Sequence, residues 1–150
     1  MKTNRILIFL LFMGIAFSCE KEYYTSIPNY PVNIELRLEN MDYELNAKLA
    51  YKTIIQPRYA VEKTGYGGIL VINGMGENPV NLFAYDLACP VEVQRNVRVV
   101  PDHSGITATC PQCGAVFTIA TGIGRPESGT KYSLKSYRVV GNGAQYIVTN

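Results

Sequence analysis

The sequence predicts an all-β fold, a small antiparallel β-sandwich or barrel that forms a single domain. Short apolar stretches alternate with turn residues along most of the 150-residue chain, and no long amphipathic helical pattern is present. The clearest strand lies at 32–38, where four apolar residues alternate with polar ones: Val32, Ile34, Leu36 and Leu38. This period of two is typical of a half-buried strand. Many short strands at this spacing are typical of a sandwich or barrel.

Further strands are expected in order along the chain. Residues 42–55 alternate as a strand would, and we favour a strand there, although 45–50 would also suit a short helix. Turns rich in Gly, Asn and Pro separate the remaining elements, and a Gly- and Pro-rich loop is expected before 136. The other strands are expected at 69–72, 80–87, 97–100, 105–110, 115–119, 136–140 and 145–148.

Residues 1–18 have the pattern of a secretory signal peptide. Lys2 and Arg5 precede an apolar run at 6–17, which is much shorter than the roughly 20 residues that span a bilayer as a helix. The following Ala-Phe-Ser-Cys at 16–19 resembles the lipobox of bacterial lipoproteins, in the relaxed form found in the Bacteroidetes. The resemblance implies lipidation of Cys19. The alternative is an ordinary cleaved signal, in which Cys19 carries no lipid.

We therefore expect a lipid anchor and tether at 19–30 and a β domain at 31–150. The tether is polar, and Pro28 and Pro31 disfavour regular structure in it. The mature protein is expected to attach to a membrane through its N-terminal lipid. This places it in the outer membrane or cell envelope, facing the periplasm or the cell surface, with an envelope protein as its partner.

Charge and motif content exclude several functions. Of the 14 Lys and Arg residues, two lie in the signal, which leaves 12 against 12 Asp and Glu residues. Without a basic cluster or a nucleic-acid motif, nucleic-acid binding is not expected. The chain has one histidine and no G-x-S-x-G sequence, so no hydrolase site is expected. Five acidic residues without paired spacing are expected at the solvated surface: Asp42, Glu44, Glu62, Glu77 and Asp86.

Three cysteines besides Cys19 are the main candidates for chemistry. An odd number in an exported chain argues against a complete disulfide framework. The sequence Cys110-Pro-Gln-Cys113-Gly114 lies between two expected strands. It should form a knuckle that turns two sulfurs toward one ion. Cys89 and His103 are the remaining candidate ligands. Because His103 lies in a turn seven residues before Cys110, we expect a solvated loop residue there rather than a ligand.

Residues 32–150 resemble the Rieske domain, a β-sandwich electron carrier that holds a [2Fe–2S] cluster between two hairpin loops. The resemblance rests on 67–73, 83–91 and 110–117, and continues through 122–126, 136–140 and 145–148. The family's loops carry C-x-H and C-x-x-H. Cys89 and Cys110 fall on the two cysteine positions, while Val91 and Cys113 fall on the two histidine positions. Valine has no ligand atom, so the resemblance implies a Rieske-like domain with a degenerate ligand set.

Three states of this site remain open. In the first there is no metal, and Cys110 and Cys113 either pair or stay reduced. In the second, Cys89, Cys110 and Cys113 hold zinc or iron, with His103 or water as the fourth ligand. In the third, the cysteines hold an atypical [2Fe–2S] cluster with an unidentified ligand such as Glu92, and the chain is an electron-transfer component of an oxidoreductase. Of these states, we expect either a site without a cofactor or a site that holds zinc. The protein is then expected to be a non-catalytic structural or partner-binding lipoprotein.

Overall fold

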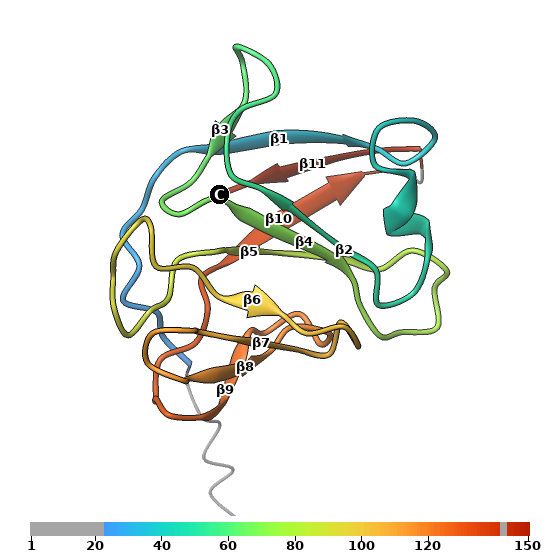
Figure 1. Cartoon of the computed structure of the whole chain (residues 1–150). Helices are drawn as coiled ribbons and strands as arrows, with labels where there is room; N and C mark the ends of the chain where they lie inside the picture. Colours follow the sequence, from blue (N-terminus) through green and yellow to red (C-terminus); the bar gives the residue numbers. More distant parts are fainter. Residues whose placement is uncertain (1–22, 142–143) are drawn as a thin grey trace, which may run out of the picture.

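A computed structural model describes residues 23–141 and 144–150 (Figure 1). The expected signal peptide, Cys19 and the start of the expected tether lie outside these residues. Within the described part, no helix is long and apolar enough to cross a membrane.

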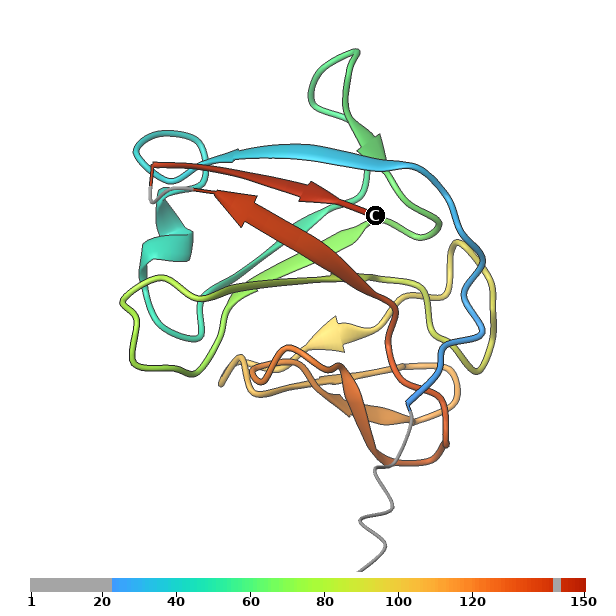
Figure 2. The ribbon, with the colours of Figure 1, turned by 180° about the vertical axis from the view of Figure 1, so that it is seen from behind.

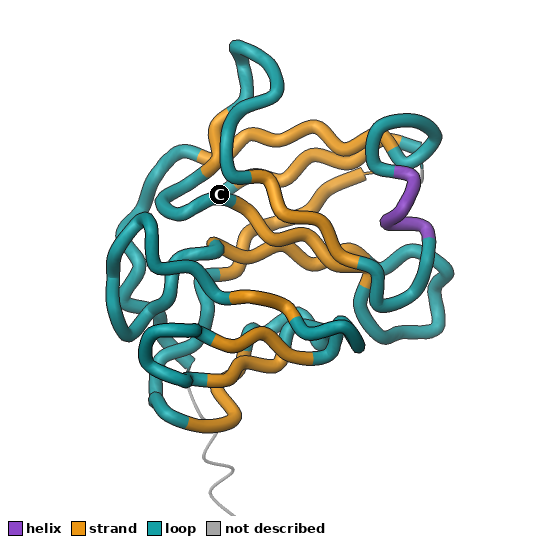
Figure 3. The backbone as a smooth tube through the Cα atoms, in the orientation of Figure 1, coloured by secondary structure: helices purple, strands orange, loops and turns teal. Residues whose placement is uncertain are grey.

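Short strands joined by loops make up most of the described chain (Figure 3). The helical element in this part is a four-residue 3-10 helix, η1 (Tyr43–Asn46). The strands are β1 (Val32–Arg37), β2 (Tyr51–Ile54), β3 (Lys63–Thr64), β4 (Ile69–Asn73), β5 (Leu82–Asp86), β6 (Val100–Pro101), β7 (Thr107–Thr109), β8 (Val116–Thr118), β9 (Arg125–Ser128), β10 (Ser136–Gly141) and β11 (Gln145–Thr149).

The strands form two antiparallel sheets. The larger has seven strands in the order β2-β4-β5-β10-β11-β1-β3, and the smaller has four in the order β6-β7-β8-β9. In β1 the residues alternate between buried and more exposed positions, as the sequence pattern predicts. Figures 1 and 2 show the small sheet below the large one in both views.

The large sheet curves over a first apolar core. Side chains of β1 and β4 belong to the same buried cluster, although three strands separate them in the sheet order. The sheet must therefore fold toward itself. The buried members are Val32, Ile34, Leu36, Leu38, Leu45, Ile54, Ile69, Val71, Leu82, Ala84, Tyr137 and Val148.

A second apolar core lies between β4–β5 and the small sheet. Its buried members are Leu70, Ile72, Tyr85, Leu87, Cys89, Val97, Val99, Ala108, Cys110, Ala115, Phe117, Ile119 and Leu134. Alternate residues of β4 therefore face opposite cores, because side chains in a strand point to the two faces in turn. This explains why Ile69–Asn73 is buried at every position.

The predicted fold class is confirmed. The described residues form a single all-β domain of antiparallel sheets, in which the cysteine knuckle belongs to a small separate sheet. The described part of the expected tether, 23–30, contains no strand. It lies along the domain, with Ile27 buried and the Tyr24 carbonyl oxygen accepting from the Ser133 N–H at 3.1 Å.

The strand favoured over 42–55 is only half right. Its second half is β2, but its first half contains η1, and Leu49 has a φ of 62° that interrupts an extended backbone. The buried carboxyl group of Asp42 helps to fix this turn, since it accepts from the Arg37 backbone N–H at 2.8 Å. Leu45 then packs into the first core from the 3-10 helix rather than from a strand.

Two details of the small sheet also differ from the prediction. Part of the expected Gly- and Pro-rich loop forms the edge strand β9, where Pro126 is tolerated because an edge strand has one unpaired side. The strand expected at 97–100 is reduced to Val100–Pro101. Residues 97–99 instead pair irregularly with 87–89, through a bridge between Ala88 and Arg98.

The expectation of a solvated surface is wrong for three of the five acidic residues. Asp42, Glu62 and Asp86 are at most 2% exposed. Arg58 binds both Asp42, at 2.9 Å, and Glu62, at 2.7 Å. A buried carboxylate is stable only with such partners. Because these carboxylates are paired with an arginine and not with each other, no paired spacing of acidic residues marks them in the sequence.

We expect Arg58→Met to lower the free energy of unfolding by about 3–5 kcal/mol, because it removes the ion pairs that Arg58 forms with two buried carboxylates. The matched control is Arg37→Met, since Arg37 forms an exposed pair with Glu35. The control should hardly change stability. Urea unfolding followed by circular dichroism measures both. Equal, small effects of the two substitutions would contradict this account of the buried pairs.

Candidate metal centre

Three thiols from two separate turns lie together at the edge of the second core. Cys89 follows β5, and Cys110 and Cys113 follow β7. All three Sγ atoms lie within 4.8 Å of one another, and those of Cys89 and Cys113 are 3.7 Å apart. None of the three is in a disulfide. Cys89 and Cys110 are fully buried, whereas Cys113 is exposed, so the group opens to solvent on one side.

The first turn, residues 89–93, and the second turn, residues 110–114, have the same backbone arrangement. Each begins with Cys-Pro, and the N–H of the residue four positions on donates to the cysteine carbonyl oxygen. These bonds run from Val93 to Cys89 and from Gly114 to Cys110, both at 2.9 Å. Val93 and Gly114 both have positive φ, at 53° and 72°. A valine rarely adopts this conformation, so its presence marks a turn imposed by its surroundings.

Backbone N–H groups surround the first sulfur of each turn in the same way. Those of Glu92 and Val91 act to lower the pKa of Cys89, and those of Cys113 and Gln112 act to lower the pKa of Cys110. Such donors stabilise a thiolate. In both turns these N–H groups therefore favour the thiolate form of the first cysteine.

The two buried thiols differ in acidity. Burial raises the pKa of Cys89 to about 12, despite its two N–H donors. Burial also acts to raise the pKa of Cys110, but the N–H donors and the neighbouring thiols outweigh it and lower that pKa below its usual value. Cys110 is therefore the sulfur that gives up its proton more readily.

The spacing of the sulfurs fits one four-coordinate metal ion. Zinc–sulfur bonds of about 2.3 Å at tetrahedral angles place two thiolates roughly 3.8 Å apart. The 3.7 Å between Cys89 and Cys113 agrees with this value. A disulfide would instead require about 2.05 Å. The turns can thus supply three ligands to one ion, and a fourth is needed.

The structure places His103 away from this group. His103 is exposed and lies in the turn that joins β6 to β7, whereas Cys110 follows the other end of β7. Its ring nitrogens do not belong to the group of ligand atoms that all lie within 4.8 Å of one another.

A histidine-ligated [2Fe–2S] cluster does not fit these residues. Val91, at the position of the first family histidine, offers no ligand atom, and its side chain is 38% exposed. Cys113 occupies the second histidine position, and the one histidine of the sequence is His103. The two-cysteine, two-histidine set of a Rieske centre is therefore absent.

Asp86, at the end of β5, fixes the turn that carries Cys89. Its carboxyl oxygens accept from the backbone N–H groups of Tyr66 at 2.8 Å, Gly67 at 2.9 Å and Ala88 at 2.8 Å. The Tyr137 hydroxyl donates to it at 2.7 Å. Burial, then the nearby Asp86 carboxyl group, raises the pKa of Tyr137. Sequence reasoning missed this role, because none of the partners lies at a recognisable spacing.

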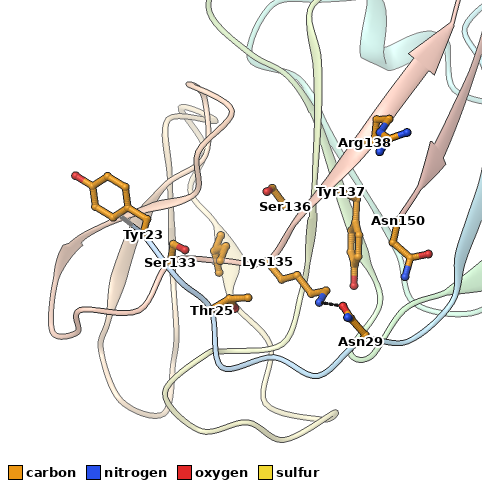
Figure 4. A pocket seen from close by; sticks show the side chains of 10 residues that line it. Tyr23, Thr25, Asn29, Ser133, Lys135, Ser136, Tyr137, Arg138 and Asn150 are labelled. Atoms are coloured by element: carbon orange, nitrogen blue, oxygen red, sulfur yellow. Dashed lines mark hydrogen bonds between the residues drawn. The ribbon is translucent and has the colours of Figure 1, made fainter. Parts of the chain in front are cut away.

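Apart from the cysteine group, a hollow of about 380 Å³ lies between residues 23–29 and β10 (Figure 4). Several of its polar groups already have partners. Lys135 binds the Asn29 side chain and the Ile27 carbonyl oxygen, and the Tyr137 hydroxyl binds Asp86. This hollow is therefore a weaker candidate for a binding site than the cysteine group.

Comparison with known proteins gives little further information. No family model and no curated protein sequence matches the chain. One crystal structure is similar over 78% of this chain and 97% of its own, at 11% sequence identity and a TM-score of 0.44. It is described as a nitrite reductase NADPH (small subunit) oxidoreductase protein. A likeness this low carries no chemistry over to this chain.

We expect Asp86→Asn to lower the free energy of unfolding by about 3 kcal/mol or more, since the new amide would face buried N–H donors. Tyr137→Phe removes a single donor and should cost about 1–2 kcal/mol. Urea unfolding measures both. Asp86→Asn should also speed the reaction of Cys89 with a thiol reagent in the metal-free protein. An unchanged rate would show that Asp86 does not position this turn.

Proposed function

We propose that this protein is a cell-envelope lipoprotein whose Rieske-like β domain is a non-catalytic structural or partner-binding module. In this proposal Cys89, Cys110 and Cys113 hold one zinc ion in place of an iron–sulfur cluster. The convergence of three sulfurs within 4.8 Å carries it. Zinc held by thiolates is usually structural, and here it would join the turn after β5 to the turn after β7.

A structural role agrees with the position of the sulfurs. Cys89 and Cys110 belong to the second apolar core, so an ion bound there ties the large sheet to the small one. Because the ion binds only the folded arrangement, its binding energy adds to the stability of the fold. Redox chemistry of the Rieske kind has no such support, since Val91 removes one of the required ligands.

An aromatic and arginine group beside the first turn supports partner binding. Arg95 lies over the rings of Tyr30 and Tyr66, with its Cζ 4.2 Å and 4.9 Å from their centroids. The Tyr66 hydroxyl donates to the Val93 carbonyl oxygen at 2.9 Å, which joins this group to the cysteine turn. Tyr30 is 38% exposed. Tyrosine and arginine are enriched at protein interfaces.

The proposed anchor would hold the domain close to the membrane. Residues from 23 onward lie along the domain, so only 20–22 would separate it from a lipidated Cys19. At roughly 3.6 Å per residue, this link spans at most about 15 Å. The partner would then be a protein that reaches the same membrane surface.

Metal analysis of the full-length protein, purified anaerobically in detergent without chelators, tests the zinc proposal. We expect about one zinc per chain and no visible absorption. Chelation should lower the melting temperature, because it removes binding energy from the folded state. Iron with acid-labile sulfide and visible absorption would overturn the proposal in favour of electron transfer. A metal-free protein with a Cys110–Cys113 disulfide would also overturn it.

The proposed anchor is tested separately. We expect Cys19→Ser to release the protein from the membrane fraction, because the thiol that would carry the diacylglycerol is lost. The matched control is Cys113→Ser, which should leave membrane attachment unchanged. Fractionation of cells that express each variant measures this. Retention of the Cys19→Ser protein in the membrane fraction would contradict lipidation at that residue.

A further inference from the structure

We infer that the carboxylate of Glu92 is the fourth ligand, which makes the site three thiolates and one oxygen around one zinc ion. The inference rests on the proposed zinc function and adds the ligand that it lacks. It begins from the equivalence of the two turns. The second turn has cysteines at its first and fourth positions, Cys110 and Cys113. The first turn has Cys89 and Glu92 at the same positions.

The hydrogen bonds show that these positions correspond in space as well as in sequence. In both turns the residue four positions after the first cysteine has a positive φ, 53° at Val93 and 72° at Gly114. In each turn the N–H four residues on donates to the cysteine carbonyl oxygen at 2.9 Å. The backbone of Glu92 is therefore placed relative to Cys89 as that of Cys113 is placed relative to Cys110.

The Glu92 side chain already extends to the opposite turn. Its Oε2 accepts from Gln112 Nε2 at 3.0 Å, and Gln112 is the residue directly before Cys113. Glu92 is partly buried, and this hydrogen bond places its carboxylate beside the residue that precedes Cys113. In this conformation the Glu92 carboxylate does not belong to the group of ligand atoms that all lie within 4.8 Å of one another. To bind the ion, the Glu92 carboxylate must give up the hydrogen bond that it accepts from Gln112.

Chemistry and position favour Glu92 over the other candidates. Zinc accepts carboxylate oxygens at about 2.0–2.2 Å. His103 lies beyond the far end of β7, and Asp86 is occupied by four donors. Three thiolates and a carboxylate exceed the charge of the ion by two. Backbone N–H groups that favour the thiolate forms of Cys89 and Cys110 offset part of this excess.

Titration of the metal-free full-length protein with Co²⁺, followed by competition with Zn²⁺, tests this ligand. Glu92→Gln should weaken Zn²⁺ binding by about 10- to 100-fold, because it replaces an anionic ligand with a neutral amide. Glu92→Cys should strengthen binding and raise the thiolate-to-cobalt charge-transfer absorption by about a third, as a fourth thiolate is added. The matched control is Glu77→Gln, an exposed carboxylate in another loop, which should behave as wild type.

The outcomes separate this inference from the proposal on which it rests. If the wild-type protein binds neither Co²⁺ nor Zn²⁺, the zinc proposal and the inference both fail. If wild type and Glu92→Gln bind Zn²⁺ equally, and Glu92→Cys adds no charge-transfer absorption, zinc stays and Glu92 is rejected. Circular dichroism of each metal-free variant shows whether weak binding comes from loss of the fold. The gain expected for Glu92→Cys cannot come from misfolding.

Discussion

The burial of β4 on both faces is the constraint on which the rest of the structure depends. Ile69 and Val71 face the core inside the curved sheet, while Leu70 and Ile72 face the core shared with the small sheet. A strand buried on both sides requires a layer on each side of it. The small sheet is the layer that covers the second side. Its attachment there brings the turn after β7 to the turn after β5.

This arrangement places two thiols in an apolar core, and that position limits their chemistry. An unpaired thiolate is costly there, as the raised pKa of Cys89 shows. The backbone donors and a divalent ion together can offset the cost. Because the ion must displace protons from the thiols, metal binding should strengthen as the pH rises. The site and the packing of the two sheets therefore depend on each other.

Local patterns in the sequence predict most of the fold and one half of the site. The alternation in 32–38, the apolar run at 69–72 and the Cys110–Cys113 knuckle are each visible within a few residues. The roles of Asp42 and Asp86 are not, because their partners come from distant segments. The repeated Cys-Pro of the two turns was a usable signal for their equivalence. Only the observed backbone hydrogen bonds and positive φ angles show that Glu92 corresponds to Cys113.

X-ray absorption at the metal edge of the purified full-length protein would identify the bound ion and count its sulfur and oxygen ligands. We expect zinc with three sulfur neighbours at about 2.3 Å and one oxygen neighbour at about 2.0–2.2 Å. Iron with a second iron nearby would show that the cysteines hold a cluster. Zinc with only nitrogen and oxygen neighbours would show that the three thiols are not its ligands. Either result would contradict the account.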